Sequence, residues 1–152
     1  MRHFTLSHCA GDKSIPAALR KTVADAIASV AVKAGPGAAT RIRGQLLSQL
    51  KASGWSGEVS VSASSDMTIT SAKDDIGLCM QTGNMSRIFA DLMKLQAMYL
   101  DDLIKGAVIV LPSQEMARLL GDNIAQAKRL ERELAIFKKA YHVPTLVFAM
   151  ES

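Results

Sequence analysis

Two short apolar runs constrain the fold of this chain more than any other feature. Residues 107–111 are Ala-Val-Ile-Val-Leu and residues 146–149 are Leu-Val-Phe-Ala, and neither run alternates with polar residues. Strands without alternation are typical of a sheet that is covered on both faces. The stretch 113–140 between them has helical periodicity, and strand–helix–strand units form right-handed parallel crossovers. The sequence therefore predicts two parallel buried strands with helices on both sides of the sheet.

The rest of the chain predicts helices and an antiparallel meander around these strands. Apolar residues recur at helical spacing in 14–32, 38–53 and 86–103. Between 58 and 81 the period changes to two, which indicates strands, and a short strand is expected around Phe4. The predicted class is α/β, with a mixed sheet made of an antiparallel meander plus a parallel strand–helix–strand unit, flanked by helices. We expect a single domain over 1–152, with a helical N-terminal part (1–57) and a core (58–152).

Composition and short sequence patterns indicate the cellular location of the protein and the class of partner that it binds. Hydrophobic residues make up 49% of the chain and charged residues 21%, which argues against disorder. No apolar run reaches the roughly 18 residues that a membrane span needs, so no membrane partner is expected. The N-terminus lacks a signal-peptide pattern, and Cys9 and Cys79 do not make a disulfide framework, which together favour a cytoplasmic protein. The net charge of +4 permits nucleic-acid binding without requiring it.

The meander carries a row of polar side chains on one face. If Ser71–Asp74 forms the tight turn between its last two strands, Thr70 pairs with Asp75, Thr68 with Gly77, and Asp66 with Cys79. Side chains alternate along a strand, so these residues share a face with Gln81, opposite a core face of apolar residues. This polar face is either the solvated side of an ordinary sheet or a cradle for a hard cation.

The helix expected at 86–103 carries a second polar feature. Arg87, Asp91 and Lys94 stand at i, i+4 and i+7, in one stripe along the helix. This stripe is either a charge-paired surface or a set of two cations and one acid beside the polar face of the meander.

The stretch from Asp66 to Pro112 resembles the PD-(D/E)XK restriction endonucleases, most closely the branch typified by the Bam and Bgl enzymes. In that branch an Asp is followed, after a variable gap, by Glu-x-Gln or Glu-x-Glu, then by a turn with Asn and a helix with an Asp-Leu pattern. This chain has Gln81-Thr82-Gly83-Asn84, then Ala90-Asp91-Leu92, then Gly106-Ala107-Val108-Ile109-Val110-Leu111-Pro112. The resemblance covers 58–112 by motif and 113–150 by element order, and no part of 1–57. It implies a restriction-endonuclease-like fold.

Carried over residue by residue, the resemblance implies a catalytic set of Asp66, Cys79 and Gln81. Asp66 matches the metal-binding Asp, with Asp75 as a competing candidate, and the backbone carbonyl of Met80 would be a further metal ligand. Cys79 stands where the family has its central Glu. A thiol is a poor ligand for Mg²⁺ and is mostly neutral at its ordinary pKa of about 8.5.

Two alternatives remain open for the absence of the central Glu at position 79. Asp75, Glu58 or Asp91 supplies a carboxylate from another position, or a softer metal such as Mn²⁺ or Zn²⁺ tolerates the sulfur.

The function that the resemblance implies is action on double-stranded DNA by a homodimer. If the site is active, the reaction is phosphodiester hydrolysis dependent on Mg²⁺ or Mn²⁺. The expected DNA contacts are Arg41, Arg43, Asn84, Arg87 and Lys94, and Asp91 would hold neighbouring side chains in place. The alternative is a catalytically degenerate module that keeps the fold for binding DNA or protein.

Overall fold

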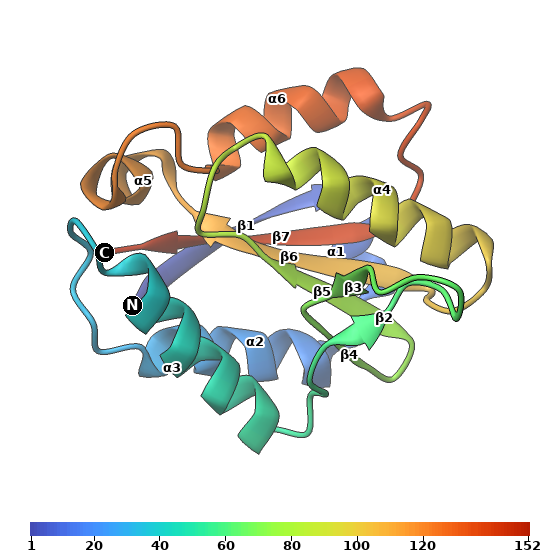
Figure 1. Cartoon of the computed structure of the whole chain (residues 1–152), viewed down its shortest axis with the longest axis horizontal. Coiled ribbons are helices and arrows are strands. Elements are labelled where there is room, and N and C mark those ends of the chain that lie inside the picture. The colour runs from blue at the N-terminus through green and yellow to red at the C-terminus, as the bar shows by residue number, and fades with distance from the viewer.

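The computed structural model describes all residues, 1–152, and its centre is a five-stranded mixed sheet in the order β1-β7-β6-β5-β4 (Figure 1). β6 (Gly106–Pro112) pairs in parallel with β5 (Ile76–Met80) on one side and with β7 (Thr145–Glu151) on the other. β1 (Arg2–His8) and β4 (Ser71–Lys73) pair antiparallel at the two edges. A separate hairpin joins β2 (Val59–Ser60) to β3 (Thr68–Ile69). The predicted α/β class with a mixed sheet is confirmed.

Helices cover both faces of this sheet (Figure 1). α2 (Ala17–Ser29) and α3 (Ala39–Ala52) lie on one face, preceded by the short α1 (Gly11–Ser14). α4 (Arg87–Leu100) and α6 (Ala127–Phe137) lie on the other face, and α5 (Gln114–Leu120) follows β6. None of these helices is long and apolar enough to span a membrane.

The sheet divides the buried apolar residues into two clusters. Val108, Val110 and Phe148 face the α2–α3 side, whereas Ile109 and Val147 face the α4–α6 side. This division follows from the alternation of side chains along a strand. All seven residues of β6 are buried, as predicted for a strand covered on both faces.

The hairpin that joins β4 to β5 turns two residues later than predicted. Asp74 and Asp75 form the turn, with φ of 48° and 64°, and Ser71 pairs with Leu78. Two successive residues with positive φ match the twist of a two-residue hairpin, and Asp tolerates that conformation. The predicted pairing of Asp66 with Cys79 is therefore wrong, and continuing the observed register by one residue places Thr70 opposite Cys79.

The expectation of a polar face on β5 is also wrong, because both of its faces are buried. A methyl group added at Gly77 would lie 3.1 Å from side-chain atoms of Ile69 and Leu95. These residues of β3 and α4 occupy the space that the predicted polar face would need, so β5 is a central strand rather than a half-exposed one.

The N-terminal part contributes a strand as well as helices. The strand expected around Phe4 is β1, whose seven residues pair with β7 from Arg2–Glu151 to His8–Thr145. Residues 1–57 therefore complete one edge of the sheet.

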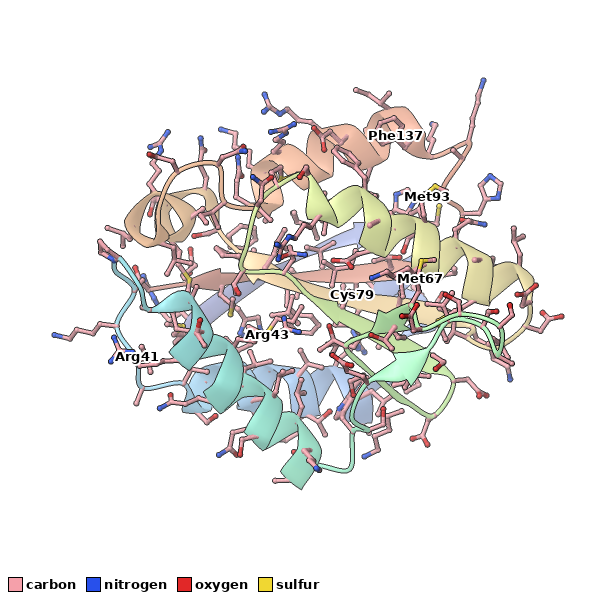
Figure 2. All side chains as sticks on the ribbon, viewed as in Figure 1. Arg41, Arg43, Met67, Cys79, Met93 and Phe137 are labelled. Atoms are coloured by element: carbon pink, nitrogen blue, oxygen red, sulfur yellow. The ribbon has the colours of Figure 1, made fainter.

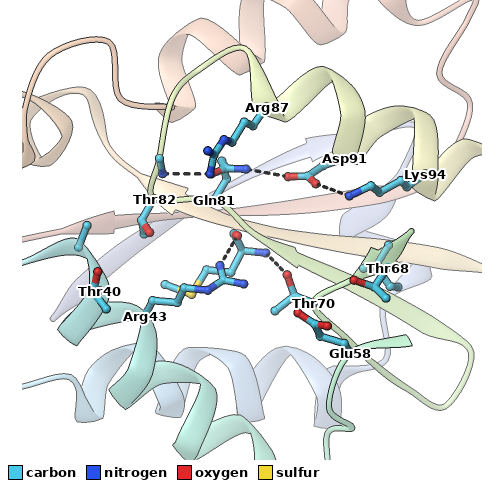
Figure 3. Close-up of a pocket in the computed structure, with 14 residues that line it drawn as sticks. Thr40, Arg43, Glu58, Thr68, Thr70, Gln81, Thr82, Arg87, Asp91 and Lys94 are labelled. Atoms are coloured by element: carbon cyan, nitrogen blue, oxygen red, sulfur yellow. Dashed lines mark hydrogen bonds and ion pairs between the residues drawn. The ribbon is translucent and has the colours of Figure 1, made fainter. Parts of the chain in front are cut away.

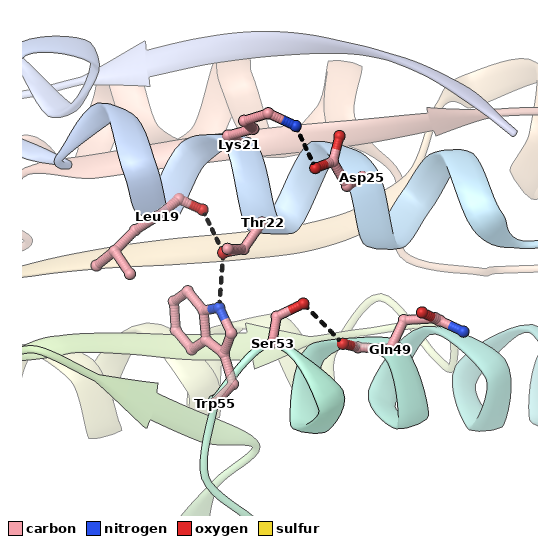
Figure 4. Close-up of polar contacts among 7 residues, drawn as sticks. All are labelled: Leu19, Lys21, Thr22, Asp25, Gln49, Ser53 and Trp55. Carbon is pink, nitrogen blue, oxygen red and sulfur yellow. Dashed lines mark hydrogen bonds and ion pairs between the residues drawn. The ribbon is translucent and has the colours of Figure 1, made fainter.

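Trp55 connects the C-terminal end of α3 to α2 (Figure 4). Its side chain is 2% exposed, and its indole Nε1–H donates to Thr22 Oγ1 at 2.9 Å. The Thr22 hydroxyl in turn donates to the carbonyl of Leu19 at 2.8 Å. On the solvent side of the same helix, Lys21 and Asp25 form an exposed ion pair.

We expect Trp55→Ala to lower the free energy of unfolding by about 3–5 kcal/mol, because it removes a large buried ring and leaves a cavity. Lys21→Ala is the matched control, with an expected loss below about 0.5 kcal/mol, because exposed ion pairs contribute little. Urea unfolding followed by circular dichroism measures both. Equal losses in the two variants would contradict the anchoring role of Trp55.

Candidate functional site

A polar cleft of about 450 Å³ opens between α3 and α4, beyond the C-terminal end of β5 (Figure 3). α3 contributes Thr40 and Arg43, and α4 contributes Arg87, Asp91 and Lys94. The floor includes Met80, Gln81 and Thr82, and Glu58, Thr68 and Thr70 line the side of the β2–β3 hairpin.

The cleft exists because β4 is shorter than β5. β4 pairs only as far as Leu78, so the backbone of Met80 has no partner strand on that side. An unpaired backbone group at a sheet edge needs another hydrogen-bonding partner. The N–H of Met80 donates to Thr70 Oγ1 at 3.0 Å, and its carbonyl accepts from Arg43 Nη1 at 2.6 Å.

The predicted stripe on α4 lies beside Gln81, and its three residues line the cleft together with that side chain. Gln81 Nε2 donates to Asp91 Oδ2 at 3.1 Å, and Lys94 Nζ lies 3.9 Å from Asp91 Oδ1. Gln81 Oε1 accepts from the N–H of Gly83 at 3.0 Å, which fixes the side chain at both ends. Gln81 and Asp91 therefore form a connected polar wall of the cleft.

Asp91 is the most perturbed acid of the cleft. Its side chain is 13% exposed, and this burial raises its pKa above the ordinary value. The hydrogen bond from Gln81 and the charges of Lys94, Arg43 and Arg87 act in the opposite direction and only partly offset the burial.

Cys79, which we predicted to be catalytic, is not among the residues that line the cleft. The side chain is 1% exposed and belongs to the apolar cluster under α4 and α6. Burial, and next the negative charge of Asp91, raise the pKa of the thiol far above its ordinary value. A neutral buried thiol is neither a nucleophile nor a metal ligand for the cleft.

The two predicted metal-binding aspartates are also outside the cleft. Asp66 is exposed in the loop between β2 and β3, because the observed register no longer brings it opposite β5. Asp75 forms the hairpin turn at the other end of β5, with Oδ2 3.8 Å from Lys105 Nζ. Of the alternative carboxylates, Glu58 and Asp91 line the cleft and Asp75 does not.

The five predicted DNA-contacting residues separate into two groups. Arg43, Arg87 and Lys94 line the cleft. Arg41 is exposed on α3 and points away from it (Figure 2), and Asn84 is exposed with its side-chain carbonyl bound to the N–H of Ser86. Sequence spacing did not distinguish Arg41 from Arg43, because both lie off the apolar stripe of the helix.

Four threonines, which the sequence did not single out, line the cleft: Thr40, Thr68, Thr70 and Thr82. Thr70 is the informative one, because continuing the observed register places it across from Cys79, and its hydroxyl accepts from the N–H of Met80. The adjacent residues Asp74 and Asp75 were the sequence signal for the turn, and placing the turn there would have brought Thr70 opposite Cys79.

The residues of the cleft do not fit a divalent cation. The carbonyl of Met80, an expected ligand, already accepts from the Arg43 guanidinium. Asp91 is bound by Gln81 and Lys94, and three cationic side chains surround the same space. Mg²⁺ and Mn²⁺ favour carboxylate and carbonyl oxygens, and positive neighbours repel them.

Comparisons with known proteins agree on one family. The family model described as "Restriction endonuclease BglII/BglIII" matches residues 7–150, including the N-terminal part for which the motif resemblance found no counterpart. The crystal structure of BglII complexed with a DNA 16-mer is similar with a TM-score of 0.86 and 11% identity, covering 100% of this chain and 78% of BglII. Free BglII has a TM-score of 0.80 and 11% identity, with 100% and 80% coverage. No curated protein matches the sequence.

Asp91 generates a pH prediction. Its pKa is raised in the folded state, so the folded protein binds the proton more tightly than the unfolded chain, and the stability falls as pH rises above the ordinary value of 3.8. We expect Asp91→Asn, which cannot ionise, to gain stability relative to the natural protein as pH rises from 4 to 7. Asp25→Asn, the same substitution at an exposed position, is the matched control variant. Urea midpoints of the three proteins, measured across this pH range, test the prediction. A trend of opposite sign for Asp91→Asn would contradict the raised pKa of Asp91.

Proposed function

Because the chain belongs to the restriction endonuclease BglII/BglIII family, we propose that it binds double-stranded DNA at the α3–α4 cleft without hydrolysing it. One observation carries this proposal. The Arg43 guanidinium donates a hydrogen bond to the Met80 carbonyl, the oxygen that the resemblance assigns to the metal as a ligand.

Binding of DNA is supported by the charge of the cleft and by the fold. Arg43, Arg87 and Lys94 converge from two helices on one cleft. Lysine and arginine contacts to phosphates supply most of the affinity of proteins for DNA. The fold is shared with an endonuclease that was crystallised on a DNA 16-mer.

The absence of hydrolysis is supported by the chemistry of the motif positions. The observed register, continued by one residue, brings Thr70 rather than the predicted Asp66 opposite Cys79, and Cys79 stands where the resemblance has its Glu. Neither side chain carries a charge at neutral pH, and Cys79 is buried outside the cleft. A carboxylate pair that holds the metal and orients the attacking water is therefore missing from both positions.

A second candidate is metal-dependent cleavage with relocated acids. It is favoured by one observation, namely that Glu58 and Asp91 both line the cleft. The cationic neighbours of Asp91 oppose it.

We further propose that the protein is a homodimer that uses an apolar surface on α4 and α6. Met93 and Leu100 are 74% and 67% exposed, and they line a groove of about 480 Å³ with Phe89 and Phe137 (Figure 2). Phe89 and Phe137 pack edge to face with centroids 6.1 Å apart. Contiguous exposed apolar surface of this kind marks interaction sites.

The function is tested with a labelled pool of random duplexes and with supercoiled plasmid. We expect the logarithm of the binding constant to fall linearly with the logarithm of the salt concentration, because contacts from Arg43, Arg87 and Lys94 to DNA phosphates release counterions. We expect the plasmid to stay intact with Mg²⁺ and with Mn²⁺. Cutting that Glu58→Gln or Asp91→Asn abolishes would instead establish the second candidate, and absence of binding at low salt would exclude a DNA role and leave a protein-binding module.

The dimer is tested by light scattering at micromolar concentration. We expect twice the chain mass for the natural protein and a monomer for Met93→Glu, because burying a carboxylate in an apolar interface weakens association by about tenfold or more. Met67→Glu, on the β2–β3 loop, is the matched control, since Met67 is 51% exposed outside this surface. A monomeric natural protein would contradict the proposal.

A further inference from the structure

We propose that Arg43 takes the place of the divalent cation and makes the cleft a metal-independent receptor for one phosphodiester phosphate. This inference rests on the proposed function and deepens it, because it names the group that the cleft binds and the residue that binds it. Arg87 and Lys94 are the supporting cations.

The first step concerns the donors of Arg43 that remain available. A guanidinium carries five N–H donors in a planar fork, and it cannot be deprotonated in a protein. The hydrogen bond from Nη1 to the Met80 carbonyl is the only one that the side chain makes within the chain. The backbone of β5 therefore orients the fork and leaves most of its donors for a ligand in the cleft.

The second step concerns charge. No carboxylate lies within ion-pair distance of Arg43 or Arg87, whereas Lys94 is paired at 3.9 Å with Asp91. Arg43 is half-buried, and a charge that is withdrawn from water without a partner is costly. An anion seated in the cleft would pair with both free guanidinium groups.

The third step concerns the surrounding polar groups. The hydroxyls of Thr40, Thr68 and Thr82 make no hydrogen bond within the chain and line the same cleft, so they are free to donate to phosphate oxygens. The cleft also contains two acids. Asp91 is already bound by Gln81 and Lys94, and Glu58 is exposed beside Thr70 (Figure 3). Two acids against three cations favour a ligand with one negative charge, which a phosphodiester carries.

The geometry also explains why a cation is needed at this point of the fold. The Met80 carbonyl faces the cleft because β4 ends before it, and its oxygen attracts positive charge. A guanidinium satisfies that oxygen with one N–H and keeps its other donors available for a phosphate in the cleft.

The direct test is an NMR titration of the natural protein in EDTA with the dinucleotide TpT, which presents a single phosphodiester. We expect the side-chain Nε–Hε signals of Arg43 and Arg87 to shift, and that of Arg41 to stay. The neutral methylphosphonate analogue of TpT should shift none of them, and inorganic phosphate distinguishes a general anion site from one that requires the diester. We expect added Mg²⁺ to leave the TpT affinity unchanged.

Variants give the energetic test. Arg43→Gln should weaken TpT binding by about tenfold or more, because a charge-assisted bidentate contact is lost. Arg43→Lys keeps the positive charge without the planar fork of donors, so its affinity for TpT should lie between those of the natural protein and Arg43→Gln. Thermal melts by circular dichroism show whether each variant is folded. The titration of the natural protein needs no variant, so the proposal stays testable if Arg43→Gln does not fold.

The outcomes separate this inference from the proposed function. Duplex binding without any shift of Arg43, or TpT binding that requires Mg²⁺ and survives Arg43→Gln, would overturn the inference and leave the DNA function standing. TpT binding at Arg43 without duplex binding would keep the phosphate receptor and overturn the DNA function.

Discussion

The parallel pairing of β6 between β5 and β7 is the constraint on which the rest of the structure depends. A parallel strand cannot be reached by a tight turn, so each pairing requires a crossover, and each crossover helix covers a face of the sheet. β6 is buried along its whole length as a result. Because both faces are covered, the polar side chains of a functional site lie at the ends and edges of the sheet rather than on its faces.

The cleft is the direct consequence of an edge that is only partly closed. β4 pairs with three residues of β5 and stops, and the backbone of Met80 is left facing outward. Its two hydrogen-bonding groups are satisfied by side chains, the hydroxyl of Thr70 and the guanidinium of Arg43. This edge of the sheet therefore holds an alcohol and a fixed positive charge.

Membership of the family and the chemistry of the site therefore lead to different conclusions. The family match and the shared architecture show the fold that frames the cleft. The residues in it are the basis for our proposal on its chemistry, because a fold hosts a function only through the side chains at its site. The structure buries the thiol of Cys79, directs the hydroxyl of Thr70 to the N–H of Met80, and directs the guanidinium of Arg43 to the Met80 carbonyl.

Local patterns in the sequence determined the features that depend on neighbouring residues alone. Unbroken apolar runs predicted the buried strands, helical spacing predicted the helices, and the i, i+4, i+7 stripe correctly grouped Arg87, Asp91 and Lys94 beside Gln81. Tertiary structure alone decided which distant residues meet. A two-residue change in the hairpin turn removed Asp66 from the site and brought Thr70 to it, since cross-strand neighbours depend on the register of the whole pair. The packing of α3 on the sheet likewise selected Arg43 over Arg41, because the direction of a polar side chain is set by what its helix packs against.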